Sequence, residues 1–124
     1  MASALNWFEI PAVDFDRAVT FYETILAIAI NRAEMGGVAM GIFPHSDGGV
    51  GGHIQGPSED DNKPSSSGTI VYLDAEGKLD ASIERVEGAG GKILLPKMKI
   101  DEEGYIALVL DTEGNKVGLH AMNP

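Results

Sequence analysis

The start of the chain changes from a strand-like pattern of apolar residues to a helical one. The segment 6–13 is short and mostly apolar and ends next to Asp14, which predicts a strand that leads into a turn. After Asp14 or Asp16, either of which can cap a helix, apolar residues recur at steps of three and four. These residues are Ala18, Val19, Tyr22, Ile25 and Leu26. The spacing predicts an amphipathic helix after the first strand.

Short apolar runs and turn residues fill the rest of the first half. Segments 38–43 and 50–54 are apolar, and the proline, serine and glycine residues of 44–49 between them predict a hairpin. The glycine-rich stretch 47–52 lacks the lysine and the helix start that a phosphate-binding loop needs, so it also fits the hairpin. Segment 56–68 mixes proline, glycine, serine and charged residues without periodicity, which predicts an exposed connection.

The second half repeats this order of elements. The pattern predicts, in turn, a strand, a helix and three strands, at 69–73, 79–89, 92–95, 105–110 and 116–120. The two predicted helices align 64 positions apart, since Asp16 corresponds to Asp80 and Tyr22 to Val86. A half of this size scarcely buries a stable core alone, so the two halves are expected to pack together or to pair with a second chain.

These patterns predict an α+β fold in a single domain that spans residues 1–124. Its parts are a first module at 5–56, a linker at 57–68 and a second module at 69–124.

The composition fits one globular domain and excludes several partners. Apolar residues make up 44% of the 124 residues, and 19 acidic against 9 basic residues give a net charge of −10. Such a field repels phosphate backbones and anionic lipids, so we expect no nucleic acid and no membrane partner. No apolar run approaches the roughly 20 residues of a membrane span, and no basic segment leads into an apolar one at the start. The chain contains no cysteine, which excludes disulfides, and we expect a cytoplasmic location.

Several short motifs resemble those of a known family. They are the segments WFEIP at 7–11, DRA at 16–18, FY at 21–22, LD at 79–80, AGGK at 89–92 and DTEGN at 111–115. Together they resemble the vicinal oxygen chelate superfamily of glyoxalases, ring-cleaving dioxygenases and bleomycin resistance proteins. The resemblance covers nearly the whole chain. It implies paired βαβββ modules that form a cupped mixed sheet, a small-molecule ligand in the cup and a homodimer.

The resemblance also implies a divalent metal, and here the sequence departs from the family pattern. The ligand position on the first strand falls at Trp7, and its equivalent in the second module falls near Thr69 or Ile70. The positions on the last strand of each module fall at Gly52 and Gly118. None of these side chains is a usual metal ligand, and glycine has none to offer. We therefore predict no metal and no other cofactor.

Two polar residues are candidates for catalysis. Strand alternation places Glu9 on the face of Trp7 and His120 on the face of Gly118, so the pair could act as general base and acid. The competing interpretation is a solvated carboxylate and an exposed histidine. Alternation turns His53 away from the inner face unless a bulge re-aims it. His45 lies in the predicted hairpin turn, where an exposed side chain is expected.

Aromatic and methionine residues on the strands are candidates for ligand binding, with the core as their alternative place. They are Trp7, Met40, Phe43, Tyr72 and Tyr105. The charged segment 97–104 resembles a mobile loop over the mouth of the cavity. Ala27 stands where relatives of this family often have glycine after the first helix.

Two functions follow from these candidates. The first is a binding protein with a degenerate metal site, which holds an apolar or aromatic small molecule in the cup. The alternative is an enzyme, a glyoxalase-like lyase or isomerase that uses Glu9 and His120 or a metal with relocated ligands.

Overall fold

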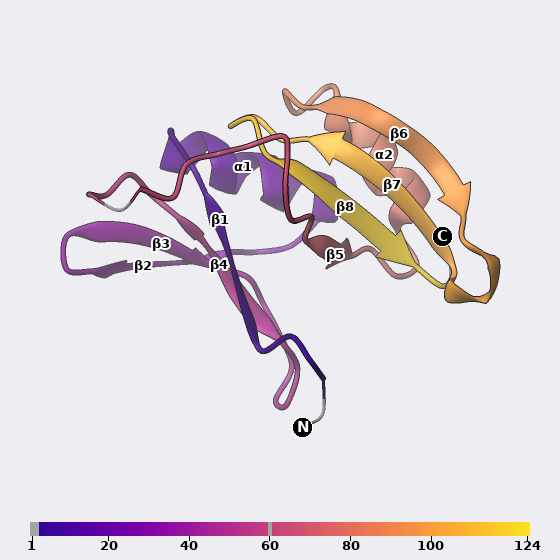
Figure 1. Cartoon of the computed structure of the whole chain (residues 1–124), viewed down its shortest axis with the longest axis horizontal. Helices are drawn as coiled ribbons and strands as arrows, with labels where there is room; N and C mark the ends of the chain where they lie inside the picture. The colour runs from indigo at the N-terminus through magenta and orange to yellow at the C-terminus, as the bar shows by residue number, and fades with distance from the viewer. Residues whose placement is uncertain (1–2, 60) are drawn as a thin grey trace.

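The first half of the chain folds into one mixed sheet and one helix in the computed structural model, which describes residues 3–59 and 61–124 (Figure 1). Residue 60, in the predicted linker, and residues 1–2 lie outside the described part. The elements are β1 (Trp7–Pro11), α1 (Phe15–Leu26), β2 (Asn31–Met35), β3 (Val38–Ile42) and β4 (Gly51–Gln55). The strands lie in the order β1-β4-β3-β2, and β1 runs parallel to β4.

The second half has the same arrangement. Its elements are β5 (Tyr72–Asp74), α2 (Leu79–Val86), β6 (Lys92–Lys99), the short 3-10 helix η1 (Asp101–Glu103), β7 (Tyr105–Leu110) and β8 (Lys116–Ala121). The strands lie in the order β5-β8-β7-β6, and β5 runs parallel to β8. Each half is thus a βαβββ module, and the predicted α+β class is confirmed. Within the described residues, no helix is long and apolar enough to cross a membrane.

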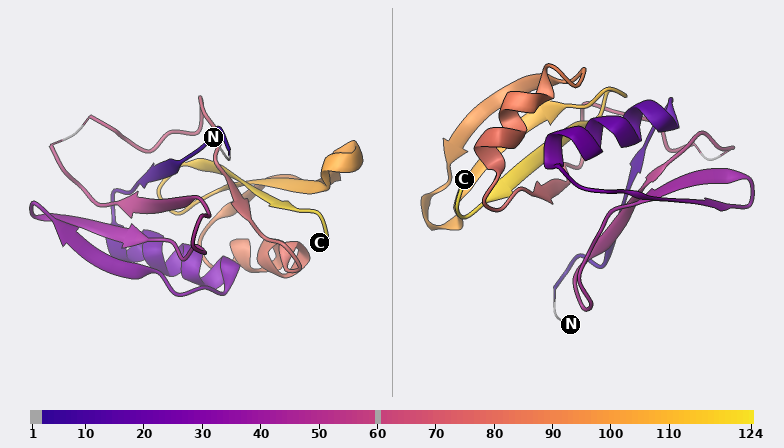
Figure 2. Two further views of the ribbon diagram at one scale, coloured as in Figure 1. Left: turned by 90° about the horizontal axis from the view of Figure 1, so that it is seen from below. Right: turned by 180° about the vertical axis from the view of Figure 1, so that it is seen from behind.

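The two helices lie side by side and cover one face of the sheets (Figure 2). In the first sheet Ile10 and Ile54 are paired neighbours, point toward α1 and are buried. In the second sheet Leu73 and Leu119 are paired and buried in the same way. We call this the helix face of each sheet, and the opposite one the open face. Because side chains alternate along a strand, the register of these pairs fixes which residues lie on each face.

The open face carries the residues that the helices do not cover. In the first sheet these include Trp7, Glu9, Met40, Gly51, His53 and Gln55. In the second sheet they include Tyr72, Asp74, Leu108, Gly118 and His120. Aromatic, acidic and imidazole groups therefore gather on the open faces.

The first helix begins and ends at the expected places. The Asp14 side chain accepts a hydrogen bond from the backbone N–H of Arg17 at 3.1 Å, which caps the helix. The helix ends at Leu26, and the C-cap residue Ala27 has a φ of 53°, in the left-handed region. Glycine adopts this conformation at no steric cost, whereas alanine is strained there.

Replacing Ala27 with glycine is expected to raise the free energy of unfolding by about 0.5–1 kcal/mol, because relief of the strained φ outweighs the added flexibility of the unfolded chain. Urea denaturation of the two proteins measures this difference. The matched control is Ala29→Gly, at an exposed position where φ is not positive, which should be neutral or destabilising. A lower stability of the Ala27 variant would contradict the interpretation.

Three elements differ from the sequence-based predictions. Strand β2 was not predicted, because all five of its residues are exposed and it forms only by pairing with β3. Strand β6 extends to Lys99, so the prediction of a loop from residue 97 is wrong for its first three residues. The register of β6 with β7 shifts on both sides of Leu95, which removes the regular alternation by which a strand is recognised. Helix α2 ends at Val86, three residues before its predicted end.

Candidate functional site

A buried histidine lies on the open face of the first sheet, between β1 and β3. Because β1 and β4 are parallel, Trp7 stands beside Gly51 and Glu9 beside His53. The prediction that His53 turns away from the face of Trp7 is therefore wrong. Its physical reason is the register, which puts Gly51 rather than Gly52 on the open face.

A chain of hydrogen bonds fixes the imidazole of His53. The indole N–H of Trp7 donates to Nδ1 of His53 at 2.8 Å, and Nε2 of His53 lies 2.9 Å from Oε1 of Gln55. An indole nitrogen can only donate, so Nδ1 must accept and the proton of the neutral ring is on Nε2. That proton points to Gln55 and to the Glu9 carboxylate, whose Oε1 is 3.4 Å away. The tautomer and orientation of His53 are thus set by its neighbours.

Glu9 is the charged group of this cluster. Its side chain is 33% exposed, and Oε2 accepts a hydrogen bond from Nδ2 of Asn62 at 2.9 Å. Glu9 also borders a polar cavity of about 270 Å³ between β1, the linker and the start of β8. A carboxylate held on one side and open on the other can accept a hydrogen bond from a ligand.

Each open face carries an aromatic ring that lies over a glycine of the paired strand. A Cβ atom added to Gly51 would lie 2.6 Å from the Trp7 ring, and one added to Gly118 would lie 2.2 Å from the Tyr72 ring. The neighbour of Gly118 is therefore Tyr72, two or three residues after the expected Thr69 or Ile70. Both rings are nearly half exposed, at 44% for Trp7 and 47% for Tyr72. The two modules thus repeat one aromatic–glycine arrangement.

These residues do not fit a divalent metal of the kind that the family resemblance implies. The space beside each glycine, where a ligating side chain would begin, is filled by an aromatic ring. Gly52, the position expected for one ligand, lies on the helix face under the ring of Phe8, 2.3 Å from an added Cβ. Residues 3–59 and 61–124 contain no group of three histidine or acidic side chains placed to hold a metal ion.

The other predicted ligand-binding residues lie in different places. Met40 is half-buried on the open face of the first sheet. Phe43 is buried in the core, with its ring centroid 5.4 Å from that of Phe8 and 5.6 Å from that of Tyr22. Tyr105 is half-buried in the second module, and the ammonium of Lys97 lies 5.7 Å from its ring centroid. Trp7, Met40 and Tyr72 are therefore the ones that reach an open face.

The predicted pair Glu9 and His120 is not joined within the chain. His120 lies on the open face of the second sheet, where its Nε2 is 2.6 Å from the carbonyl oxygen of Glu103. Glu9 lies in the first sheet beside His53 and Asn62. Among the described residues, no hydrogen bond or ion pair links Glu9 with His120. The structure brings Glu9 together with His53 instead.

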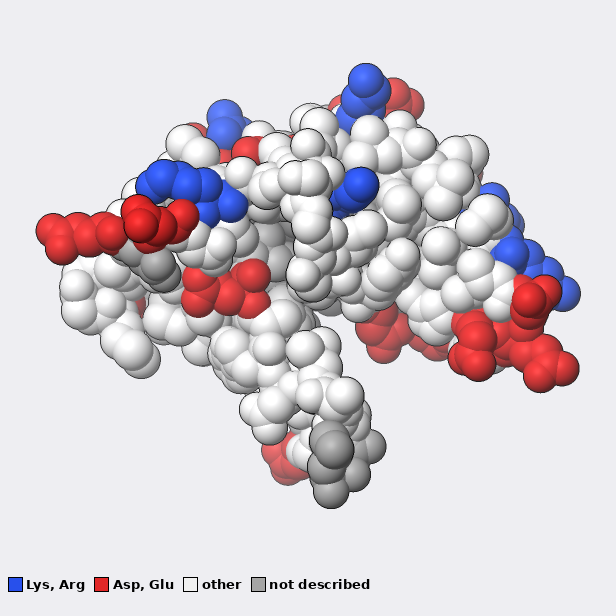
Figure 3. Space-filling view, viewed as in Figure 1, with Lys and Arg blue, Asp and Glu red and all other residues white. Residues whose placement is uncertain are grey.

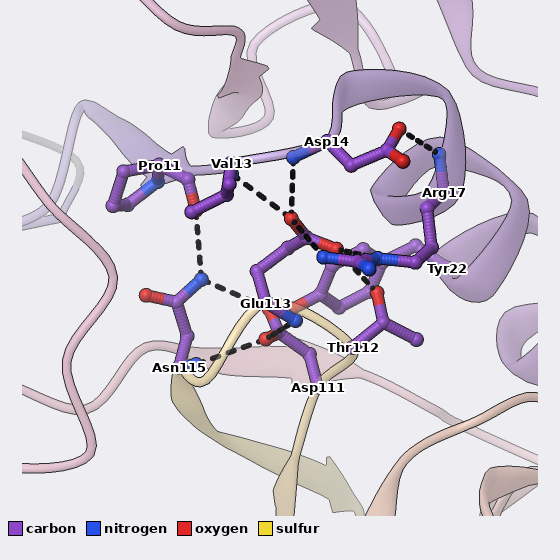
Figure 4. A network of polar contacts seen from close by, with 9 residues as sticks. All are labelled: Pro11, Val13, Asp14, Arg17, Tyr22, Asp111, Thr112, Glu113 and Asn115. Carbon is purple, nitrogen blue, oxygen red and sulfur yellow. Dashed lines mark hydrogen bonds and ion pairs between the residues drawn. The ribbon is translucent and has the colours of Figure 1, made fainter.

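A buried carboxylate ties the second module to the start of α1 (Figure 4). Oε1 of Glu113 accepts hydrogen bonds from the backbone N–H groups of Val13 at 2.9 Å and Asp14 at 2.7 Å. Arg17 adds two bonds and Thr112 a third, so the carboxylate is surrounded by donors. Burial by itself raises the pKa of Glu113, but the bonds from Arg17, Asp14 and Thr112 outweigh burial and hold that pKa below its ordinary value.

A second carboxylate completes this network. Oδ1 of Asp111 accepts from the backbone N–H groups of Glu113 and Asn115, and Oδ2 accepts from the Tyr22 hydroxyl at 2.5 Å. Burial, with the adjacent Asp111 carboxylate, raises the pKa of Tyr22 well above its ordinary value. Asn115 donates to the carbonyl oxygen of Pro11 at 2.8 Å. The segment 111–115, which was given above only as one of the motifs that resemble the family, therefore also positions β1.

The lowered pKa of Glu113 predicts a loss of stability in acid. The Glu113 carboxylate binds a proton less readily in the folded protein than in the unfolded chain. Its contribution to the free energy of unfolding is therefore complete above the unfolded pKa. This contribution is lost as the pH falls through the lower pKa of the folded protein. Urea denaturation at about pH 6 and about pH 3 measures this loss. In Glu113→Gln the decrease in stability between these pH values should be smaller. An equal decrease in both proteins would contradict the assignment.

The comparisons with known proteins agree with this architecture. The family model of the Glyoxalase/Bleomycin resistance protein/Dioxygenase superfamily matches residues 4–119, so the chain belongs to this family. No curated protein matches the chain.

Solved structures of the same fold include three whose names indicate a range of activities. One is a glyoxalase/bleomycin resistance protein from Albidiferax ferrireducens T118, with 17% identity, 96% of this chain and 98% of that chain covered, and a TM-score of 0.73. A second is a glyoxalase-related enzyme from Fulvimarina pelagi, which is 12% identical with a TM-score of 0.70. The match covers 96% of this chain and 88% of that chain. The third is the fosfomycin resistance protein FosX from Listeria monocytogenes, in complex with Mn(II) and sulfate, which is 13% identical with a TM-score of 0.65. The match covers 98% of this chain and 93% of that chain. At these identities the likeness shows the fold alone.

Proposed function

We propose that the chain is a small-molecule-binding protein that holds a flat apolar or aromatic ligand against its open faces without a metal. The observation that carries the proposal is the pair of exposed rings, Trp7 over Gly51 and Tyr72 over Gly118. Trp7 and Gly118 are two of the positions at which the family resemblance implies metal ligands. A ring without a side chain beneath it is free to stack on a planar ligand. The polar cluster of Glu9 and His53 supplies hydrogen-bonding groups beside Trp7.

We also propose that two copies of the chain associate through their open faces. Large apolar side chains are exposed on or beside these faces, among them Trp7, Met35, Tyr72 and Met98. Apolar groups gathered in this way mark a ligand or protein interface more often than a free surface. Sedimentation velocity distinguishes a dimer from a monomer. A monomer at all concentrations would contradict this part of the proposal. The expected cytoplasmic location stays a prediction.

Trp7 provides a direct test of ligand binding, because it is the only tryptophan of the chain. A stacked ligand is expected to quench its fluorescence in a saturable way, and a library of planar compounds can be screened by this signal. Trp7→Ala with Tyr72→Ala should abolish binding, which calorimetry measures without the tryptophan. The matched control is Leu94→Ala, at an exposed apolar residue of the edge strand β6. Saturable binding that survives the double substitution would contradict the proposed site.

Added metal ions separate this proposal from the usual chemistry of the family. Mn²⁺, Ni²⁺, Zn²⁺ and Fe²⁺ are expected to leave the melting temperature unchanged, since an ion that binds the folded state raises it. A large and specific rise with one ion would contradict the metal-free proposal.

The second candidate is an enzyme, a lyase or isomerase in general type. The distance of 3.4 Å between Oε1 of Glu9 and Nε2 of His53 favours it, because a carboxylate beside a histidine can transfer protons. The sequence-based version of this candidate uses Glu9 with His120 or a metal with relocated ligands. In a turnover assay Glu9→Gln should abolish activity if Glu9 acts with either histidine, whereas an enzyme that uses a metal with relocated ligands should keep activity. His120→Gln should abolish activity only if His120 acts across two copies of the chain.

A further inference from the structure

A second cavity lies between the two modules, on the side of the first sheet opposite to its open face. Its volume is about 350 Å³, within the range of about 300–1,000 Å³ that is usual for small-molecule sites. The surface is hollowed between the arm formed by β1 and β4 and the second module (Figure 3). One wall is Phe8, which points to the helix face because it is paired with Gly52. The cavity is therefore separate from Trp7, Glu9 and His53.

Most of the cavity wall is apolar. Phe8 and Phe43 contribute neighbouring rings, and Leu26 and Ile28 contribute aliphatic groups from the end of α1. The ring of Phe8 packs on the backbone of Gly52, where it occupies the space of a missing Cβ. An aryl or short alkyl group would thus find a preformed apolar wall.

One end of the cavity is polar and carries charged groups from the second module. The ammonium of Lys78 donates to the carbonyl oxygen of Leu26 at 2.6 Å, which directs it toward the end of α1. Asp74 is exposed, and its Oδ1 accepts only the backbone N–H of Glu76 at 2.9 Å. Among the described residues, Oδ2 of Asp74 has no hydrogen-bond partner. A carboxylate oxygen is therefore available at the rim.

The free edge of β5 adds backbone groups beside this carboxylate. The carbonyl of Val71 accepts from Gly118, and the N–H of Ala75 donates to His120, so these groups face β8. Alternation along the strand turns the backbone groups of Tyr72 and Asp74 away from β8, and both residues line the cavity. The carbonyl oxygen of Tyr72 is thus a second acceptor near Asp74.

From this arrangement we infer that the cavity binds a small aromatic or alkyl amine. The ammonium group pairs with Asp74 and the carbonyl of Tyr72, and the apolar part packs on Phe8 and Phe43. The net charge of −10 favours a cation over an anion, and the ammonium of Lys78 is directed to the carbonyl oxygen of Leu26. This inference does not depend on the proposed function: it shares Tyr72 with it but uses the backbone carbonyl of that residue, and the cavity wall does not include Trp7, Glu9 or His53.

Three matched probes test the chemistry of the site by isothermal titration calorimetry. They are 3-phenylpropylamine, 3-phenylpropanol and 3-phenylpropanoate, which share one apolar group and differ in the polar end. The amine is expected to bind at least about tenfold more tightly than the alcohol, because a charge-assisted hydrogen bond is stronger than a neutral one. Tighter binding of the carboxylate, or no binding of the amine, would overturn the inference.

Variants locate the bound amine. Asp74→Asn keeps the oxygen that accepts from Glu76 and removes the charge, so it should weaken the amine about tenfold and leave the alcohol unchanged. Glu84→Gln, an exposed acidic residue on α2, controls for the change in net charge. Glu9→Gln should also have no effect on the amine, although it alters the site of the proposed function. Loss of amine binding in Glu9→Gln with retention in Asp74→Asn would overturn the inference and place the amine on the open face.

Discussion

Replacing Glu113 with alanine is expected to lower the free energy of unfolding by about 3 kcal/mol, one of the largest effects of any single substitution in the chain. The Glu113 side chain is fully buried, and the substitution leaves the backbone N–H groups of Val13 and Asp14 without acceptors. Arg17 contributes less to the loss, because its side chain is about half exposed and water can solvate it. Urea denaturation followed by circular dichroism measures the difference.

The matched control is Glu103→Ala, which removes an exposed glutamate of η1 and should change stability by less than about 0.5 kcal/mol. Glu113→Gln distinguishes the loss of the negative charge from the loss of the side chain, because glutamine has nearly the same shape as glutamate. Its amide keeps one oxygen acceptor but places an N–H donor against the donors of Arg17. Its stability is expected to fall between those of the wild type and Glu113→Ala. Equal stability of the wild type and Glu113→Ala would show that the contacts of Figure 4 do not hold the two modules together.

Local patterns in the sequence predict most of the fold because most of its elements are amphipathic. The helical spacing of α1 and the repeat at 64 positions both follow from side chains that each module buries against its own helix. Strand β2 has no such face, and its five exposed residues carry no signal of the pairing with β3 that makes them a strand. A strand that is defined only by its neighbour cannot be recognised from its own residues.

The candidate site was predictable only in part, because it depends on the register between strands. Trp7 and Glu9 were placed on one face correctly, since both lie on the single strand β1. His53 was misplaced by one position, because nothing in the sequence fixes how β4 aligns with β1. The bonds of Glu113 to Val13 and Asp14 join residues about 100 positions apart, and they depend on how the two modules pack. Such contacts have no local pattern.

The second large effect is expected from Gly51→Ala, which tests the aromatic–glycine arrangement on the open face. The added Cβ would lie 2.6 Å from the Trp7 ring and 2.9 Å from the His45 ring, so Trp7 has to move. Movement of the indole breaks its 2.8 Å bond to Nδ1 of His53 and leaves a buried acceptor unpaired. We expect a loss of about 1–3 kcal/mol of stability, a changed tryptophan emission spectrum and weaker binding of any ligand that stacks on Trp7.

Gly118→Ala is the matched control in the second module, because its added Cβ meets the Tyr72 ring at 2.2 Å. Among the described residues the Tyr72 hydroxyl has no hydrogen-bond partner, and the ring is 47% exposed, so it can swing outward at a smaller cost. Tryptophan emission should stay unchanged in this variant. If Gly51→Ala changed neither stability nor emission, Trp7 would not be held over the strand, and the open face would lack the fixed ring on which ligand stacking depends. If stability and emission change in Gly51→Ala but emission does not change in Gly118→Ala, the bond to His53 holds Trp7 in position. His53 in turn contacts Glu9, so the three residues are positioned together.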